Sequence, residues 1–431
     1  MADAVRIVPL DRPPDCCWMV PGSKSITNRS LILAALSPGE TLLTGALLSE
    51  DTRYMIGALR ALGIGVEIRA PDRILVDGGR ERLQPPSQAL FIGNSGTSVR
   101  FLAALACLVP GTVELVGDTH MQRRPIADLV AALQSLGVRV DCPSGCPPLR
   151  IHGGRLPGGR VAIPGARSSQ YFSALLLAGC AAEAPLEIAI IGELVSRPYV
   201  AMTVAMIRDW GGGATVEHDR LLVTPATPRA DRYAIEPDAT AASYPLAAAL
   251  ATRGRIRVPG LGADALQGDV AFAQLLASTG AIVTVDDHGL ALDARDCSRL
   301  RGIEADMHHI SDTVMTLAAI APLLTGPTTI RNVANIRIKE TDRLEATVTE
   351  LERLGQRVEH GEDWLRIEPR PLRPATVACY ADHRMAMSFA IPGLARPGVT
   401  IADPACVAKT YPGFWTDLRR LYIAVDQDPP W

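Results

Sequence analysis

Hydrophobic and polar positions recur along this chain in one fixed local order. An amphipathic helical stretch that runs into a glycine and a short alternating strand occurs five times, for example as LRALGIGVEI (59–68) and LERLGQRVEH (351–360). Glycine accepts the left-handed backbone that closes a helix. We therefore predict that a helix ends at each of the five glycines, which are Gly63, Gly137, Gly211, Gly280 and Gly355.

A second pattern alternates with the first. A polar residue opens an Ala/Leu-rich helix, which is followed by a Gly or Pro turn and a β-branched strand. Together the two patterns predict six strand–helix–strand–helix–strand units, each longer than the roughly 20–50 residues of a solenoid repeat. Two globular clusters of three units each therefore fit the pattern better than a solenoid does. The sixth unit matches the pattern least well. The six polar starts lie near Ser25, Ser95, Ser168, Thr240, Ser311 and Asp382, 70 to 73 residues apart.

Length and charge narrow the class of protein. A chain of 431 residues, 48% of them hydrophobic, favours two domains with sizeable cores. The net charge of -3 and the absence of any block of like charges argue against non-specific binding to nucleic acid or to an anionic membrane. The most apolar window, 173–192, contains Glu183 and Glu187, so no membrane span is expected.

Cysteine usage bears on metals and on the compartment. The chain has nine cysteines and no C-x-x-C pair, and no second ligand pair follows Cys142 and Cys146. We therefore expect no zinc site and interpret the cysteines as thiols in a reducing compartment. The N-terminal stretch MADAVRIVPLDRPPD has no apolar signal core, which favours a cytoplasmic location.

Basic residues gather beside the predicted helix starts. Lys24 stands in PGSKSITNRS, Arg124 in MQRRPI and Arg343 in NIRIKETDRL. Each segment alone is explained as well by a turn, a helix cap or a charge ladder along a helix. If several helix N-termini converge, however, their free N–H groups and these cations would bind a phosphate or a carboxylate.

Taken together, these segments resemble one family. PGSKSITNRS, GNSGT-x-x-R, RRPI, SSQ, KETDRL, DHRMAM and AKTYP occur in this order from about residue 20 to residue 415. In that order they are similar to the 5-enolpyruvylshikimate-3-phosphate synthase family of enolpyruvyltransferases. The resemblance implies an α/β (α+β) fold of six βαβαββ units, three per domain with pseudo-threefold symmetry. It also implies domains at 21–235 and at 1–20 with 236–431, and an active site in the cleft between them.

The same resemblance implies an activity. The enolpyruvyl group of phosphoenolpyruvate would be transferred to the 5-hydroxyl of 3-phosphoshikimate, with release of phosphate, in the shikimate pathway of aromatic amino-acid biosynthesis. No cofactor or metal is expected, because lysine and arginine supply the positive charge. A monomer inhibited by glyphosate, which mimics phosphoenolpyruvate in this family, is also expected.

Site residues follow from matching the family's motifs position by position. Asp312 and Glu340, assisted by Lys24, would carry the proton transfers. Residues expected to bind 3-phosphoshikimate are Lys24, Ser25, Arg29, Ser168, Ser169, Gln170, Ser196, Asp312, Asn335 and Lys339. Residues expected to bind phosphoenolpyruvate are Lys24, Asn94, Gly96, Arg124, Gln170, Arg343, Arg384 and Lys409.

Two alternatives stay open at this stage. The sister family of UDP-N-acetylglucosamine enolpyruvyltransferases shares the donor, but it places a cysteine shortly before the R-P dipeptide, and GDTHMQRRP contains none. A non-catalytic anion-binding module would tolerate the loss of Asp312 and Glu340, yet both carboxylates are present.

Overall fold

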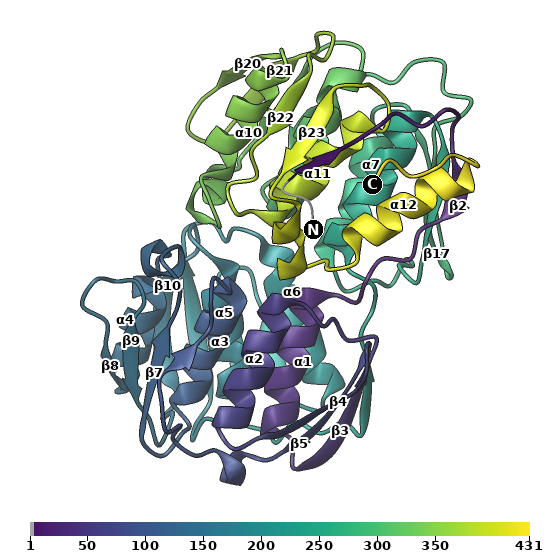
Figure 1. The fold of residues 1–431 in the computed structure, drawn as a ribbon. Helices are drawn as coiled ribbons and strands as arrows, with labels where there is room; N and C mark the ends of the chain where they lie inside the picture. Colours follow the sequence, from purple (N-terminus) through teal and green to yellow (C-terminus); the bar gives the residue numbers. More distant parts are fainter. Residues whose placement is uncertain (1–3) are drawn as a thin grey trace. The chain divides into compact units, whose positions relative to one another are not determined.

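A computed structural model describes residues 4–431 and divides the chain into two compact units. Unit 2 comprises residues 22–236, and unit 1 comprises the segment up to Pro21 together with residues 237–431. The chain therefore leaves unit 1 after its first two strands, completes unit 2, and returns to unit 1 at Pro237 (Figure 1).

Unit 2 contains three repeats of two helices and four strands each. The first consists of α1 (Lys24–Leu36), β3 (Gly39–Thr44), α2 (Glu50–Ala61), β4 (Gly65–Ala70), β5 (Arg73–Gly78) and β14 (Arg232–Ala234). The second consists of β6 (Leu90–Phe91), α3 (Gly96–Ala106), β7 (Thr112–Val116), α4 (Ala127–Ser135), β8 (Arg139–Asp141) and β9 (Leu149–His152). The third consists of β10 (Gly159–Pro164), α5 (Ser169–Gly179), β11 (Leu186–Ile191), α6 (Arg197–Asp209), β12 (Gly213–Val216) and β13 (Arg220–Thr224). The short 3₁₀ turns are η1 (Arg80–Arg82) and η2 (Met121–Arg123).

Unit 1 repeats the plan. Its first repeat consists of β2 (Asp15–Cys17), α7 (Ala239–Thr252), β15 (Arg255–Pro259), η3 (Gly268–Val270), α8 (Ala271–Ala277), β16 (Ile282–Asp286) and β17 (Gly289–Asp293). The second consists of β18 (Glu304–Asp306), η4 (Ser311–Thr313), α9 (Val314–Ile320), η5 (Ala321–Leu323), β19 (Thr328–Arg331), η6 (Ala334–Ile338), α10 (Arg343–Arg353), β20 (Arg357–His360) and β21 (Leu365–Glu368). The third consists of β1 (Ala4–Arg6), β22 (Ala375–Val377), α11 (His383–Gly393), β23 (Val399–Ala402), η7 (Pro404–Lys409) and α12 (Phe414–Ala424).

Five of the six sheets have four strands and one topology. A first strand runs parallel to the second, and the last two strands follow antiparallel, as in the order β10-β11-β13-β12. Strand β14, at the end of unit 2, completes the first sheet beside β3, and β2 does the same for β15 in unit 1. Within residues 4–431 the sixth sheet has three strands, β1-β23-β22, because α12 is not followed by a hairpin. The predicted α/β fold of six repeats, with a weaker sixth, is confirmed.

The first helix of each repeat is buried on all sides. In unit 2, α1, α3 and α5 pack against one another, and α7, α9 and α11 do so in unit 1. Every residue of α3, for example, is buried. An Ala/Leu-rich helix without a polar face is stable only when neighbours cover it completely, which explains why the second pattern of the sequence lacks amphipathic periodicity.

The polar helix starts fall close to their predicted positions. Ser95, Ser168 and Asp382 are N-caps whose side chains accept a backbone N–H of the first turn. For α1 and α7 the caps are Ser23 and Asp238, two residues before the predicted starts, and these also accept N–H groups of the first turn. Ser311 opens the 3₁₀ turn η4 and does not cap α9.

All five repeat glycines close helices, as predicted. Their φ angles lie between 78° and 106°. At Gly63 and Gly137 the next backbone N–H reaches back to a carbonyl of the last helical turn, Ile64 to Leu59 and Val138 to Leu133, both at 3.0 Å. This is the Schellman arrangement, which satisfies carbonyls that the helix end would otherwise leave unpaired. Within residues 4–431, no helix is long and apolar enough to cross a membrane.

Backbone conformation alone sets the requirement for glycine at Gly137. Its φ is 85°, and an added Cβ would meet no atom within 4 Å. We predict that Gly137→Ala lowers the free energy of unfolding by about 1–2 kcal/mol, the cost of left-handed backbone for alanine. Gly57 in α2 has equally open surroundings and an ordinary φ, so Gly57→Ala should instead stabilise by about 0.4–1 kcal/mol. Urea unfolding of both variants measures the difference, and equal effects would contradict this explanation.

Candidate functional site

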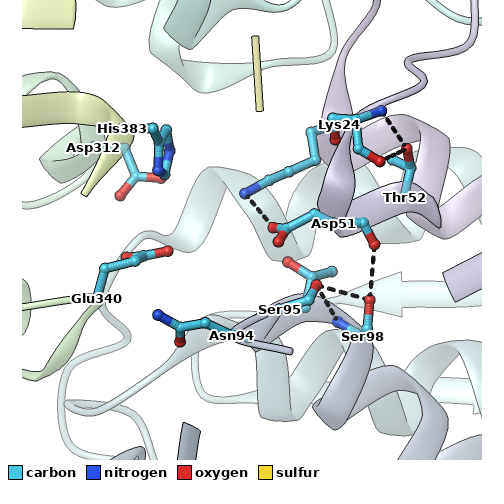
Figure 2. Close-up of polar contacts among 12 residues, drawn as sticks. Lys24, Asp51, Thr52, Asn94, Ser95, Ser98, Asp312, Glu340 and His383 are labelled. Atoms are coloured by element: carbon cyan, nitrogen blue, oxygen red, sulfur yellow. Dashed lines mark hydrogen bonds and ion pairs between the residues drawn. The ribbon is translucent and has the colours of Figure 1, made fainter. Parts of the chain in front are cut away.

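In unit 2, Lys24 is held by a buried carboxylate. Lys24 is the first residue of α1, and its Nζ lies 3.2 Å from Oδ2 of Asp51 in the first turn of α2 (Figure 2). Thr52 accepts the N–H of Ser49 at 2.9 Å, which fixes this helix start, and Ser98 of α3 donates to the Asp51 carbonyl at 3.3 Å. The first turns of α1, α2 and α3 are therefore adjacent.

Arg124, from a distant segment of the chain, contacts the loop before α3. Nη1 of Arg124 donates to the carbonyl and to the side-chain oxygen of Asn94, both at 3.1 Å. The Arg124 guanidinium then lies over Gly96, where an added Cβ would stand 2.5 Å from Nη2. Gly96 is thus required by the close approach of a cation to the N-terminus of a helix.

Gln170 links the N-termini of α3 and α5. Its amide donates to the Thr97 hydroxyl at 3.2 Å, and its carbonyl oxygen accepts from Arg100 Nη1 at 2.6 Å. Arg100 also donates to the carbonyls of Gly96 and Pro125. Neutral oxygens orient Arg100 through these bonds. We call Lys24, Asp51, Asn94, Gly96, Arg100, Arg124 and Gln170 the unit-2 cluster.

Three predicted phosphate-binding serines stand at helix starts. Ser168 caps α5 and accepts the N–H of Gln170 at 3.3 Å, and Ser169 is the first residue of that helix. Ser196 precedes α6 with a left-handed backbone, φ 52°, and is 6% exposed. Backbone N–H groups at such positions favour anions.

Arg29 is buried, and oxygens of the protein itself accept most of its N–H groups. Its guanidinium, 1% exposed, donates to Thr203, Ser173 and the carbonyls of Ser25 and Tyr199 at 2.7–3.2 Å. Burial lowers the pKa of Arg29 to about 10. These four bonds use four of its five N–H groups, so Arg29 mainly ties α1 to α5 and α6 and orients the backbone of Ser25.

In unit 1, one carboxylate meets three cations. Asp312 in η4 accepts from Arg343 Nη1 at 3.2 Å and from Arg384 Nη2 at 2.9 Å, and Lys339 Nζ lies 3.8 Å away. The like charges of Lys339 and Arg343 are thus bridged by a side chain of the protein itself. Lys339 precedes α10, so no charge ladder along that helix includes it.

Arg343 stands between three carboxylates. Besides Asp312, it pairs with Glu340 at 2.8 Å and with Asp382 through Nε at 2.7 Å and Nη2 at 3.2 Å. Arg343 is 1% exposed, and the Asp382 side chain is fully buried. Asp382 also accepts the N–H of Arg384 at 3.0 Å, so it both caps α11 and orients Arg343. We call Asp312, Lys339, Glu340, Arg343, Asp382 and Arg384 the unit-1 cluster.

The remaining predicted residues of unit 1 border this cluster or lie near it in the chain. Asn335 in η6 donates to the Ser311 hydroxyl at 2.9 Å, beside Asp312 in sequence. Lys409 ends η7 and is 7% exposed. His383, the first residue of α11, is fully buried, and its Nδ1 lies 3.6 Å from Asp382 Oδ1.

The cations fix the protonation state of Asp312. Burial would raise its pKa, but Arg384, Lys339 and Arg343 together hold the pKa of Asp312 well below its usual range. The carboxylate is therefore ionised at physiological pH, and this pairing stabilises the fold above about pH 4 and is lost only as the pH falls further. Asp312 can accept a proton but has none to donate.

The sequence does not indicate two of the ion-pair partners described above, Asp51 and Asp382. Asp51, the partner of Lys24, stands in the motif SEDTRY, which reads as an ordinary acidic helix start. Asp382 was recognised only as a helix start and not as the partner of Arg343. Among residues 4–431, no group of three or more His, Cys, Asp or Glu could hold a metal ion.

Comparisons with known proteins agree with this geometry. Residues 18–418 match the family model for EPSP synthase (3-phosphoshikimate 1-carboxyvinyltransferase). The chain is 44% identical to the 3-phosphoshikimate 1-carboxyvinyltransferase of Histophilus somni (strain 2336) and 44% identical to that of Serratia proteamaculans (strain 568), covering 93% of this chain and 95% of each relative. A solved structure of EPSP synthase from Acinetobacter baumannii superposes with a TM-score of 0.81 at 25% identity, covering 97% of this chain and 98% of that one. The chain belongs to the EPSP synthase (3-phosphoshikimate 1-carboxyvinyltransferase) family.

Proposed function

We propose that this protein transfers the carboxyvinyl group of phosphoenolpyruvate to the 5-hydroxyl of 3-phosphoshikimate, releasing phosphate. The observation that carries the proposal is an ionised carboxylate, Asp312, set among Arg343, Arg384 and Lys339. A base surrounded by cations suits a reaction that removes a proton while it brings two anionic substrates together.

The chemistry needs a base, a proton donor and positive charge. The 5-hydroxyl oxygen bonds to C2 of phosphoenolpyruvate and gives up its proton, while C3 gains a proton and becomes a methyl group. A proton then leaves C3 as the bond between C2 and the phosphate oxygen breaks. This restores the double bond and releases phosphate.

The ionised state of Asp312 indicates which of the two proton transfers it can carry out. Because its carboxylate is ionised, Asp312 is assigned as the base for the 5-hydroxyl. The proton for C3 is assigned to Lys24 or to Glu340, and Glu340, which pairs with Arg343, must first take up a proton. A carboxylate with so low a pKa is a weak base. When phosphoenolpyruvate engages Arg343 and Arg384, its negative charge offsets theirs and raises the basicity of Asp312.

Phosphoenolpyruvate is assigned to cations at both clusters. Arg124, oriented by Asn94 over Gly96, and Lys24, oriented by Asp51, supply charge from unit 2, with Gln170 as a hydrogen-bond partner. Arg343, Arg384 and Lys409 supply it from unit 1. Arginine forks fit carboxylate and phosphate oxygens in pairs.

3-Phosphoshikimate is assigned to the serine helix starts. Its phosphate meets Ser168, Ser169 and Ser196, with Lys339 as the cation. Its carboxylate and hydroxyls are assigned to Ser25, Lys24, Gln170 and the one N–H of Arg29 that the protein does not use. Asp312 and Asn335 are assigned to the same substrate. The buried Oδ1 of Asn335 has no hydrogen-bond partner among residues 4–431, and it can accept a substrate hydroxyl.

The reaction itself is the first test. Purified protein given both phosphoenolpyruvate and 3-phosphoshikimate should release inorganic phosphate and form 5-enolpyruvylshikimate-3-phosphate, whereas either substrate alone should give none. Folded protein that turns over UDP-N-acetylglucosamine instead, or neither acceptor, would refute the proposal.

Asp312→Asn tests the proton acceptor. The amide oxygen can still accept from Arg343 or Arg384, so the fold should persist, while kcat falls by about 100-fold or more because the base is lost. Asp286→Asn is the matched control, since Asp286 also pairs with an arginine, Arg257, but lies outside both clusters. Activity within threefold of wild type for Asp312→Asn would remove Asp312 from the chemistry.

Gly96→Ala tests the phosphoenolpyruvate assignment. The added methyl group would stand 2.5 Å from Arg124 Nη2 and 2.8 Å from Arg100 Nη1, so one guanidinium must move. We expect KM for phosphoenolpyruvate to rise about 10-fold, as a displaced charge-assisted hydrogen bond implies. KM for 3-phosphoshikimate should stay within twofold.

Glyphosate should inhibit the wild-type protein in competition with phosphoenolpyruvate, and the Gly96→Ala variant should resist it. Gly57→Ala, which adds a methyl group in open space, is the control. An enzyme indifferent to millimolar glyphosate, or an alanine variant with unchanged constants, would argue against this binding mode.

We further propose a cytoplasmic monomer. All nine cysteines are free thiols, which fits a reducing compartment. Three of the most exposed large apolar side chains, Phe91, Ile282 and Ile423, stand on the separate elements β6, β16 and α12, which fits a monomer. Light scattering of the purified protein measures the oligomeric state.

A further inference from the structure

A buried carboxylate outside the clusters holds the segment that leads into α11. Glu350 on α10 is fully buried. Its Oε1 accepts from the Tyr380 hydroxyl at 2.7 Å, and its Oε2 accepts from the backbone N–H of Ala378 at 3.1 Å. Among residues 4–431, its one cationic partner is the half-exposed Arg353 at 3.3 Å. A buried carboxylate is costly unless such bonds satisfy it.

Helix geometry places Glu350 in line with Arg343. The two residues are seven apart on α10, which puts them on one face about 10 Å apart along the axis. Arg343 holds Asp382, and Glu350 holds Ala378 and Tyr380. The segment 378–382 is therefore fastened to one face of α10 at both of its ends.

Between the two attachment points the backbone is strained. Tyr380 and Ala381 have φ angles of 55° and 53°, in the left-handed region that L-residues avoid. Such residues cost free energy and persist only where their surroundings impose them. Without the bonds to Glu350, this segment can relax toward ordinary backbone angles, and Asp382 immediately follows it.

We propose that Glu350 is a positioning residue for phosphoenolpyruvate. It imposes the strained conformation of 380–381, which places Asp382, and Asp382 sets the orientation of Arg343 and the start of α11 at Arg384. Glu350 touches neither cation and acts through this segment. The inference rests on the proposed assignment of Arg343 and Arg384 to phosphoenolpyruvate.

Substitutions at Glu350 test the proposal. Glu350→Ala removes both bonds, and KM for phosphoenolpyruvate should rise about 10-fold or more, because an ångström-scale displacement of a binding group is sufficient for such losses. KM for 3-phosphoshikimate, whose phosphate is assigned chiefly to unit 2, should change at least fivefold less. Glu350→Gln should restore KM for phosphoenolpyruvate to within threefold, since its oxygen can accept from Ala378 and its amide can donate to the Tyr380 hydroxyl.

Tyr380→Phe covers the case in which Glu350→Ala fails to fold. It removes one of the two bonds at a side chain that is 38% exposed, so the protein should fold, and KM for phosphoenolpyruvate should rise about twofold to fourfold. An unchanged KM in Tyr380→Phe, or in folded Glu350→Ala, would overturn the proposal.

Two controls on the same helix separate positioning from stability. Leu351→Ala destabilises the core beside Glu350 but leaves both bonds of Glu350 to the 378–382 segment in place, so it should lower the melting temperature and leave both KM values within twofold. Arg353→Ala removes the half-exposed partner and should also leave both KM values within twofold. A loss in Leu351→Ala equal to that in Glu350→Ala would reduce Glu350 to a structural role. Absence of phosphate release by the wild type would instead refute the proposed function.

Discussion

The buried guanidinium of Arg343 is the interaction on which the unit-1 cluster depends. A charge this deeply buried is tolerated only when paired, and Arg343 pairs with Asp312, Glu340 and Asp382. These partners come from η4, from the loop before α10 and from the start of α11. One side chain therefore joins three segments that are far apart in the sequence, and removing any partner would leave a buried charge unbalanced.

The two clusters use different chemistry to hold their cations. In unit 2, carbonyl and amide oxygens orient Arg100 and Arg124. In unit 1, the cations surround a carboxylate whose pKa they lower. The first arrangement suits the binding of anions, and the second suits a base whose strength depends on what the cations contact. A reaction between two anionic substrates requires both properties.

Local features of the fold were predictable because local rules govern them. The five glycines end helices since few other residues adopt the left-handed backbone, and the Ala/Leu-rich segments form the buried helices. The starts of α1 and α7 were misplaced by two residues, because Ser23 and Ser25, like Asp238 and Thr240, are all acceptable caps in sequence. Only the packing decides between such neighbours.

Pairing between distant residues was not predictable. Nothing near Lys24 in the sequence indicates Asp51, and nothing near Arg343 indicates Asp382. In the same way, nothing near Glu350 indicates Ala378. The substrate assignments came from motifs shared with a family, whereas the network that orients those residues is visible only in three dimensions. Arg29 illustrates the difference, since its motif suggests a ligand contact while its bonds serve mainly the packing of α1.

The most direct test of the account is a crystal structure with 3-phosphoshikimate bound. We predict an Asp312 oxygen within hydrogen-bond distance of the 5-hydroxyl, and the substrate phosphate on Ser168, Ser169 and Ser196. A 5-hydroxyl that faces a different base, with Asp312 still enclosed by Arg343 and Arg384, would contradict it.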